Sequence, residues 1–527
     1  MRVAQKAFGI ACAALALQAC TTLGPNYREP EVEWLTEWQT DLYGQAITTD
    51  TTEEDLDFWW LAFNDPVLNG LIETARQKNS TLQIAALAIV QSRALLGIAT
   101  SSQYPQQQQL NGSWSRTDRW PTEGSDSGNR SDLNSYNAGF NVGWELDFWG
   151  RYRRGIESAD AAFFASITNY QNAQVLLSAQ MAQAYFSYRT TLQQIKIARE
   201  NGDLQKRSME ITTRLYESGQ SSELDVQQAK TQYLATLASI PSLEISLDQI
   251  ENSIAVLLGR APDKIIELTH VAEELPALSP LLIEGVPAKL MMRRPDVRTA
   301  AWQVAAQSAQ IGVAEADLYP SISLFGTLGW SGNTLNATDD NISTSFGPSF
   351  TWNLFNYDRI ENNVRVQDAS LQQLIESYQL TVLGAASEID NAAISVVKTR
   401  EKDALLKEAL VAAERSLVLS SKRYQEGYSD FQRVLSAQLA RAAASSSYVV
   451  NQGDHINSVI AFYKSLGGGW QPVDGEDLIP AKIRQIMEAR TDWGTMLDAP
   501  LPTADAPVTV PDVPLSETNG PLPAVDE

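Results

Sequence analysis

The chain has 527 residues, which is enough for several domains and a large core. Its 63 acidic residues outnumber its 40 basic ones, and the formal net charge of −23 argues against nucleic acid as a partner. Only two histidines are present, His270 and His455, so there is little material for histidine-based catalysis or for a multi-histidine metal site.

The first 20 residues have the pattern of a bacterial export signal. A short basic region precedes an apolar run at 7–17 that is too short to span a membrane. Residues 17–20, LQAC, resemble a lipobox, which implies removal of residues 1–19 and lipidation of Cys20. The alternative is a plain signal peptide with Cys20 an ordinary thiol. Thr21 follows the cysteine where an aspartate would favour the inner membrane, so by resemblance to the usual sorting rule we expect the outer membrane.

No run of 18 apolar residues follows Cys20, so the sequence predicts no transmembrane helix. A chain without such a helix can cross a bilayer only with β-strands, because no other segment satisfies its backbone there.

The chain is a duplicated unit. Similar aromatic, glycine and arginine positions recur at a fixed spacing. A shift of 208 residues superimposes Trp144–Arg151 on Trp352–Arg359, Tyr170–Gln171 on Tyr378–Gln379, Tyr216–Val226 on Tyr424–Val434, and Leu258–Gly259 on Leu466–Gly467. Farther upstream the shift is 215 residues, pairing Tyr104-Pro105 with Tyr319-Pro320. The change in shift predicts a longer loop in the first of two hairpins.

Each unit has the order helix, two strands, long helix, shorter helix. The first unit has predicted helices at 65–101, 152–216 and 223–258, the last interrupted by Pro241, and strands at 107–117 and 135–148. The second has predicted helices at 287–316, 358–424 and 431–466, and strands at 321–330 and 342–355. A helix of about 65 residues spans roughly 98 Å. The two shorter helices together nearly match it, so we expect them to lie end to end alongside it.

The strands are amphipathic. In 135–148 apolar and polar residues alternate over seven pairs, and the other strands follow the same pattern apart from Phe325. Lengths of about 10 residues with aromatics near the ends are typical of outer-membrane strands, although Pro348 removes one ladder bond. Four strands cannot close a barrel, and the smallest barrels need eight. We therefore expect oligomers, and three copies give 12 strands around a polar lumen.

Several short stretches together resemble the TolC-type outer-membrane factors, in their lipoprotein branch. They are Cys20 with 23–30 (LGPNYREP), Trp59-Trp60, Phe63, Asp65-Pro66, Leu68, 257–260 (LLGR), 293–298 (RRPDVR) and 467–470 (GGGW). The resemblance implies an α+β membrane protein, a homotrimer whose 12-stranded outer-membrane β-barrel continues into a 12-helix periplasmic α-barrel. It also implies the exit duct of a tripartite efflux pump. The partners would be a periplasmic adaptor and an inner-membrane transporter of resistance–nodulation–division type.

The same resemblance assigns roles to the helix turns, which would form a periplasmic tip that meets the adaptor and constricts the pore. The tip residues are Tyr216, Gly219, Ser221, Tyr424, Gly427 and Ser429, and the aperture candidates are Asp225, Asp430 and Arg433. Ser436 stands where the family often has an aspartate, which puts an acidic ring there in doubt. The simpler interpretation is that the glycines permit positive φ and the charges are solvated.

The expected divisions of the chain are a signal peptide at 1–19, an anchored extended segment at 20–64, repeats at 65–260 and 287–470, a linker at 261–286, and an equatorial segment with a Pro-rich acidic tail at 471–527. We expect no enzyme activity, metal or cofactor, since Gly467–Gly469 is better explained as a helix stop than as a phosphate loop. The alternatives are a type I protein-secretion channel and a coiled-coil surface lipoprotein without a pore. The exported substrate stays open.

Overall fold

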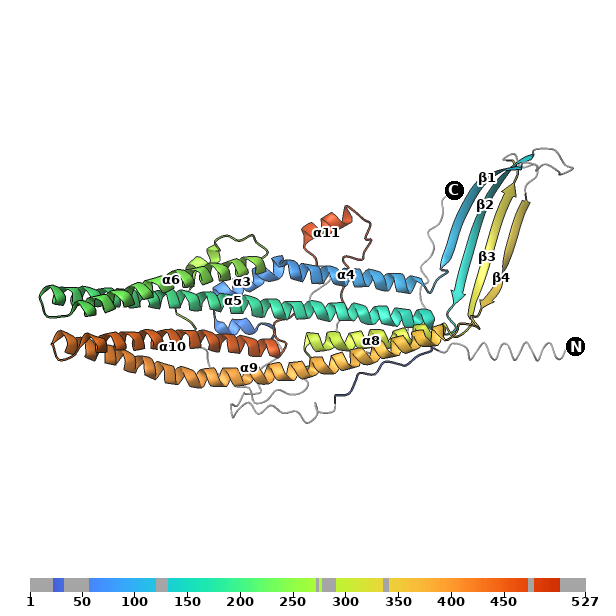
Figure 1. Ribbon diagram of the computed structural model, residues 1–527. Helices are drawn as coiled ribbons and strands as arrows, with labels where there is room; N and C mark the ends of the chain where they lie inside the picture. The colour runs from blue at the N-terminus through green and yellow to red at the C-terminus, as the bar shows by residue number, and fades with distance from the viewer. Residues whose placement is uncertain are drawn as a thin grey trace, which may run out of the picture.

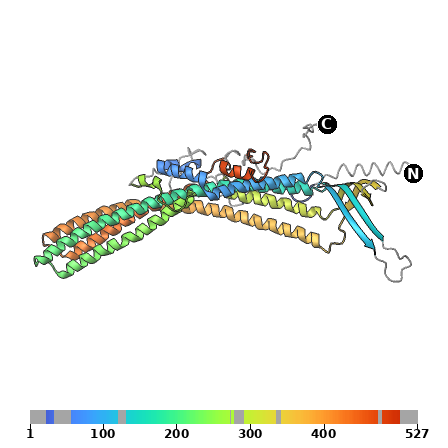
Figure 2. The ribbon, with the colours of Figure 1, turned by 90° about the horizontal axis from the view of Figure 1, so that it is seen from above.

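A computed structural model describes residues 22–32, 56–119, 131–271, 274–276, 291–334, 341–472 and 478–502. Long helices form an elongated body, and a four-stranded sheet stands at one end of it (Figure 1). Seen from above, the sheet is tilted away from the long helices (Figure 2). Cys20 and the tail beyond residue 502 lie outside the described residues.

The first repeat contains η2 (Trp59–Phe63), α3 (Pro66–Lys78), α4 (Ser80–Ser101), β1 (Gln107–Arg119), β2 (Ser131–Leu146), α5 (Arg151–Glu217), α6 (Glu223–Leu257) and η3 (Ile266–His270). The second contains α8 (Pro295–Ala316), β3 (Ser321–Gly332), β4 (Asn341–Thr351), α9 (Arg359–Gln425) and α10 (Phe431–Ser465), followed by α11 (Ala481–Glu488). The bounds of α5 and α9, and of α6 and α10, differ by 208 residues, and those of α4 and α8 by 215. The predicted duplicated fold is confirmed.

The shorter helices pack along the two long helices, α5 and α9. α5 packs against α4 and α6, and α9 packs against α8 and α10, as the matching lengths predict. The repeats join where α5 packs against α8 and α10. Near the sheet the helices therefore follow the order α4, α5, α8, α9 (Figure 1).

Three helix predictions need correction. The predicted helix at 65–101 is two helices, because Asn79 is extended (φ −66°, ψ 124°) and its side chain accepts a hydrogen bond from Leu82 N at 3.0 Å, which caps α4. Pro241 does not interrupt α6, which runs through it with its outer side exposed. The helix predicted at 287–316 is interrupted, because 291–292 are helical, 293–294 are not, and α8 begins at Pro295, a residue suited to the first helical position; 287–290 lie outside the described residues.

The strand ends also differ from the predictions. β1 and β3 run two residues farther than predicted, to Arg119 and Gly332, and the other two strands end earlier. β2 stops at Leu146 and β4 at Thr351, so the last predicted residues of each, up to 148 and 355, belong to the connections into α5 and α9. The connection between β1 and β2, 120–130, is longer than that between β3 and β4, 333–340, as the change in shift predicts.

A belt of aromatic residues crosses the middle of the helical body. The Trp59 ring stacks on Tyr463 with centroids 5.5 Å apart, and Phe63 packs on Phe186 at 4.9 Å. α10 ends at Ser465, and Gly469 N donates a hydrogen bond to the carbonyl of Leu56. The glycines after α10 thus form a helix end that receives the η2 segment.

Two helices, α4 and α9, are long and apolar enough to span a membrane by length and composition alone. Each lies against other helices of the body, α4 on α5 and α9 on α8 and α10. We therefore assign both to the helical wall.

Candidate functional site

The sheet has one strongly apolar face. The antiparallel strands follow the order β1-β2-β3-β4, and their register places Leu110, Phe140 and Leu328 side by side. Leu110 is 84% exposed and Phe346, on the same face of β4, is 90% exposed. Among the described residues, the helices extend from the end of the sheet and leave this face uncovered (Figure 1). Such a surface is unfavourable in water and suited to lipid.

The opposite face is polar and internally hydrogen-bonded. Asn141 Nδ2 donates to Asn111 Oδ1 at 3.0 Å, and Asn137 Nδ2 donates to Ser113 Oγ at 3.4 Å, in both cases across the β1–β2 pair. Phe325 lies on this face, because its Cα partner is Gly143. The face is otherwise suited to a water-filled lumen.

The sheet ends in two unpaired edges. Among the described strands, β1 pairs only with β2, and β4 only with β3. In hydrocarbon each unsatisfied backbone group costs several kcal/mol, so a lipid-facing sheet cannot keep open edges. The four strands can enter a bilayer only if their edges pair with other copies of the chain.

The start of the described chain is fixed beside the sheet. Leu23 N donates to Trp149 O at 3.1 Å, at the junction between β2 and α5. The buried Arg154 donates to the carbonyl oxygens of Leu23, at 2.8 Å, and Gly24, at 3.1 Å. Gly24 also lies so close to Gly312 that an added Cβ would come within 2.5 Å of its Cα. Residues 22–24 are therefore held at the membrane end of the helices.

An acid–phenol pair closes the same junction. Tyr152 OH donates to Glu145 Oε2 at 3.1 Å. Burial and then the Glu145 carboxylate raise the pKa of Tyr152 to about 12, so the phenol stays protonated and donates at physiological pH.

At the far end of the body, the turn between α5 and α6 contains Tyr216, Gly219 and Ser221. Gly219 has φ +74°, and Gln220 N donates to Leu215 O at 2.8 Å, a bond that closes the helix end. Ser221 Oγ donates to Asp225 Oδ2 at 2.7 Å. Asp225 is therefore engaged within its own turn.

The turn between α9 and α10 has the same backbone and different side chains. Gly427 has φ +77°, and Tyr428 N donates to Arg423 O at 2.8 Å. Asp430 caps α10, accepting a hydrogen bond from Arg433 N at 3.3 Å, and the Arg433 side chain lies 3.7 Å from the same carboxylate. Ser429 Oγ donates to the carbonyl oxygen of Asp430 at 3.4 Å.

The structure brings the two turns together through Tyr424, whose hydroxyl lies 3.4 Å from Ser221 Oγ. Its ring packs on Phe431, centroids 5.4 Å apart, and Phe431 is buried with Val434 and Ala229. The sequence reasoning missed Phe431. The signal was an aromatic at the first position of α10, where the other repeat has Glu223.

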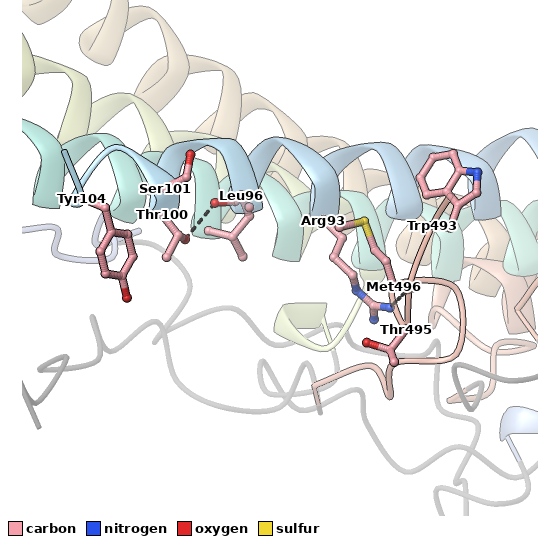
Figure 3. Close-up of a pocket in the computed structure, with 9 residues that line it drawn as sticks. Arg93, Leu96, Thr100, Ser101, Tyr104, Trp493, Thr495 and Met496 are labelled. Atoms are coloured by element: carbon pink, nitrogen blue, oxygen red, sulfur yellow. Dashed lines mark hydrogen bonds between the residues drawn. The ribbon is translucent and has the colours of Figure 1, made fainter. Parts of the chain in front are cut away.

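A groove of about 610 Å³ lies between α4 and the segment 493–496 (Figure 3). Arg93 ties the two together by donating to the carbonyl oxygens of Met496, at 2.8 Å, and Pro500, at 3.0 Å. Within the part of the chain that the structure describes, no group of three or more His, Cys, Asp or Glu side chains is placed to hold a metal ion.

An amphipathic, open-edged sheet carried on a duplicated body of long helices defines a subunit of an outer-membrane channel. A family model described as "Outer membrane efflux protein" matches residues 71–260 and 286–468, more than half of the chain, and the chain belongs to this family. It is an outer-membrane efflux channel of tripartite pumps that extends into the periplasm, and it is not an enzyme. Channels of this family are trimers that partner other pump components.

Individual relatives span nearly the whole chain. Nodulation protein T of Rhizobium leguminosarum bv. trifolii is 28% identical over 470 residues, covering 87% of this chain and 96% of that protein. The toluene efflux pump outer membrane protein TtgF of Pseudomonas putida is 26% identical over 473 residues, covering 88% and 97%. The solved structure of the outer-membrane channel OprN has a TM-score of 0.74 and 31% identity, covering 86% of this chain and all of that one.

Proposed function

We propose that three copies of this chain, each lipidated at Cys20, form one duct that receives substrate from a periplasmic adaptor at the two distal turns. The inner-membrane component that we propose is a proton-driven transporter of resistance–nodulation–division type. The segments 65–260 and 287–470 serve as repeat units, and three copies supply six such units around one axis. The open-edged sheet carries the proposal, because in a ring of copies with the same orientation the pairing of β4 with β1 of the next protomer satisfies both edges.

The position of the chain start supports the anchor. Leu23 is hydrogen-bonded at the junction of the sheet and the helices, and Cys20 is three residues earlier. Three extended residues reach at most about 11 Å, so an acyl group on Cys20 stays close to the membrane end. We expect Cys20→Ser to abolish lipid labelling and to leave the signal peptide attached. A wild-type protein that is cut before Cys20 and carries no lipid would contradict the anchor.

The tip supports a protein partner. Three apolar or aromatic residues are exposed on or beside the turns: Tyr216 at 45%, Leu224 at 62% and Tyr428 at 76%. Exposed aromatics at the end of a body made of long helices are suited to contact with another protein.

Site-specific crosslinking tests this contact. Tyr428→Cys carrying a thiol-linked photoprobe should crosslink in cells to a periplasmic adaptor. Glu408→Cys serves as the control, because it is exposed on α9 about 26 Å of helix from the end of that helix. Adaptor adducts at Glu408→Cys with none at Tyr428→Cys would refute the tip assignment.

The energy source distinguishes the transporter classes. Export that depends on this channel should stop when the proton gradient is collapsed while ATP is maintained. Continued export under those conditions would exclude a proton-driven partner and favour an ATP-driven secretion or export system.

A further inference from the structure

The joint between the two repeats contains a specific aromatic contact. Trp149, in the connection after β2, stacks on Tyr319, which precedes β3, with ring centroids 4.7 Å apart and planes at 30°. The Trp149 indole N–H donates to Pro320 O at 2.8 Å. This pair joins the connection between β2 and α5 in the first repeat to the connection between α8 and β3 in the second, beside the β2–β3 pairing.

The duplication of the chain identifies a counterpart in the other repeat for both Trp149 and Tyr319. A shift of 208 residues carries Trp149 onto Tyr357, and a shift of 215 carries Tyr104 onto Tyr319. Equivalent hydrogen bonds in the two repeats support both the 208-residue and the 215-residue shift. Trp144 donates to Gln103 O at 3.1 Å in the first repeat, and its counterpart Trp352 donates to Leu318 O at 3.0 Å in the second.

Tyr104 and Tyr357 have no ring partner among the described residues. Tyr357 is 95% exposed and Tyr104 is 61% exposed. Tyr104 lies at the end of α4, where its ring is clear of Trp493 and Met496 at the other end of the groove (Figure 3). Tyr104 precedes β1 and Tyr357 follows β4, so they mark the two open edges of the sheet.

We propose that Tyr357 of one protomer stacks on Tyr104 of the next, repeating between protomers the Trp149–Tyr319 contact within each. The inference rests on the trimer of the proposed function. In that trimer, β4 of one protomer pairs with β1 of its neighbour in the same way as β2 pairs with β3 within one chain. In the same way, α9 packs against α4 of the neighbour as α5 packs against α8 within one chain. The occupant of the groove end beside Tyr104 is therefore a second copy of this chain.

A second pair of counterparts supports the same joint. Between the repeats, Gln310 Nε2 donates to Ser158 Oγ at 2.7 Å. The corresponding residues on the outer edges are Leu95 on α4 and Val366 on α9, 53% and 58% exposed. The hydrogen-bonded pair between the repeats thus corresponds to two apolar residues on the outer edges, Leu95 and Val366. A polar-to-apolar change at both positions is expected if α4 and α9 of neighbouring protomers pack against each other there.

The backbone at Tyr357 in the single chain differs from the backbone at its counterpart, Trp149. Tyr357 has φ +49° and Asp358 φ +60°, whereas in the first repeat the left-handed position falls on Gly150 alone, with φ +74°. A left-handed conformation is strained for a residue with a Cβ. For Tyr357 to stack as Trp149 does, its backbone has to leave the left-handed region when the three protomers assemble.

Thiol crosslinking tests the contact. The proposed processing removes Cys12 with the signal peptide and places the lipid on the thiol of Cys20, so introduced cysteines have no competitor. Tyr104→Cys combined with Tyr357→Cys, treated in the membrane with a short bifunctional maleimide, should give covalent dimers and trimers. Each single variant should stay monomeric on a denaturing gel, and the two single variants co-expressed should give nothing larger than dimers.

The matched control is Trp149→Cys with Tyr319→Cys, which should be bridged within one chain and add one linker mass to a monomer. If that control is bridged and the native assembly is a trimer, but the Tyr104/Tyr357 variant yields only monomers, the proposed contact is wrong and the trimer stands. If the native assembly is a monomer, the proposed function itself fails.

Heat dissociation of the trimer gives a second readout. Tyr357→Ala should lower the dissociation temperature by several degrees, and Tyr357→Trp, which restores the residue of the first repeat, should not lower it. Phe355→Ala is the control, because Phe355 is 89% exposed in the same connection and its counterpart, Asp147, bonds to Tyr152 and Arg153 within its own repeat. Equal shifts for Tyr357→Ala and Phe355→Ala would overturn the proposal.

Discussion

The belt and the tip each contain an aspartate that caps a helix and pairs with an arginine, but the two pairs differ in burial. In the belt, Asp65 caps α3 and lies 2.6 Å from Arg189, with side chains only 9% and 4% exposed. At the tip, Asp430 caps α10 and lies 3.7 Å from Arg433, with side chains 67% and 72% exposed. The same two residue types therefore serve stability in one place and stay available to solvent and partners in the other.

The network around the belt pair explains the difference. Tyr185 OH donates to Asp65 Oδ2 at 2.8 Å, and Arg189 also bonds to the carbonyl of Glu274. Burial, followed by the hydrogen bond to Asp65 and its charge, raises the pKa of Tyr185 well above its usual range, so it remains a donor. Removal of one member leaves another charged group buried without compensation, which is costly.

The largest effect is expected from Arg189→Met. It leaves Asp65 buried without its cation and should cost about 3–5 kcal/mol of unfolding free energy, with a sharp fall in membrane yield. Arg433→Met at the exposed pair should cost about 1 kcal/mol or less. Denaturant unfolding of both purified variants measures the difference, and equal losses would break the comparison.

Gly427→Ala is expected to have the next largest effect, because Gly427 has φ +77° and no atom lies near its missing Cβ. The cost is then one of backbone conformation alone, about 1–2 kcal/mol. Gly384→Ala is the control, since Gly384 is also open but lies within α9, where alanine should stabilise by roughly 0.5–1 kcal/mol. Thermal unfolding should shift in opposite directions, and shifts of the same sign would contradict the account.

Substitution of Asp430 separates its cap from its charge. Asp430→Asn keeps a good cap without the charge and should leave stability nearly unchanged, whereas Asp430→Lys loses the cap as well, at about 1 kcal/mol. Cation selectivity in a planar bilayer should fall in both variants, and more in Asp430→Lys. If selectivity and export match wild type in both, Asp430 is a helix cap with an ordinary solvated charge.

The smallest effect concerns pH. Burial lowers the pKa of the His455 imidazole below its usual value, opposed by Asp403 and aided by Arg400, and Nδ1 lies 2.9 Å from Thr399 Oγ1. The unfolded chain therefore binds the proton first, and stability should decline as pH falls through about 6.5. His455→Asn should flatten this part of the curve. An unchanged pH dependence would show that His455 does not contribute.

The duplicated order of elements was predictable because fixed sequence shifts and simple periodicities specify it. The break at Asn79 was not, because it depends on a cap and on a hydrogen bond from its side chain to Leu257 O, 178 residues away. The intact helix at Pro241 reflects packing along α5, which local propensity does not encode.

The turns show the same limit. Positive φ at Gly219 and Gly427 follows from residue type. The pairing of Asp225 with Ser221, and the burial of Phe431, arise from how α6 and α10 are placed against their neighbours. The roles of the tip residues in docking and in ion passage stay predictions.

Native mass measurement in mild detergent tests the central claim, closure of four-stranded sheets into one barrel, most directly. The full-length chain has a mass of 58.0 kDa, and the account predicts a single species with about three times the mass of the processed, lipidated protomer. A monodisperse monomer whose strands are nevertheless inserted in membranes would contradict it.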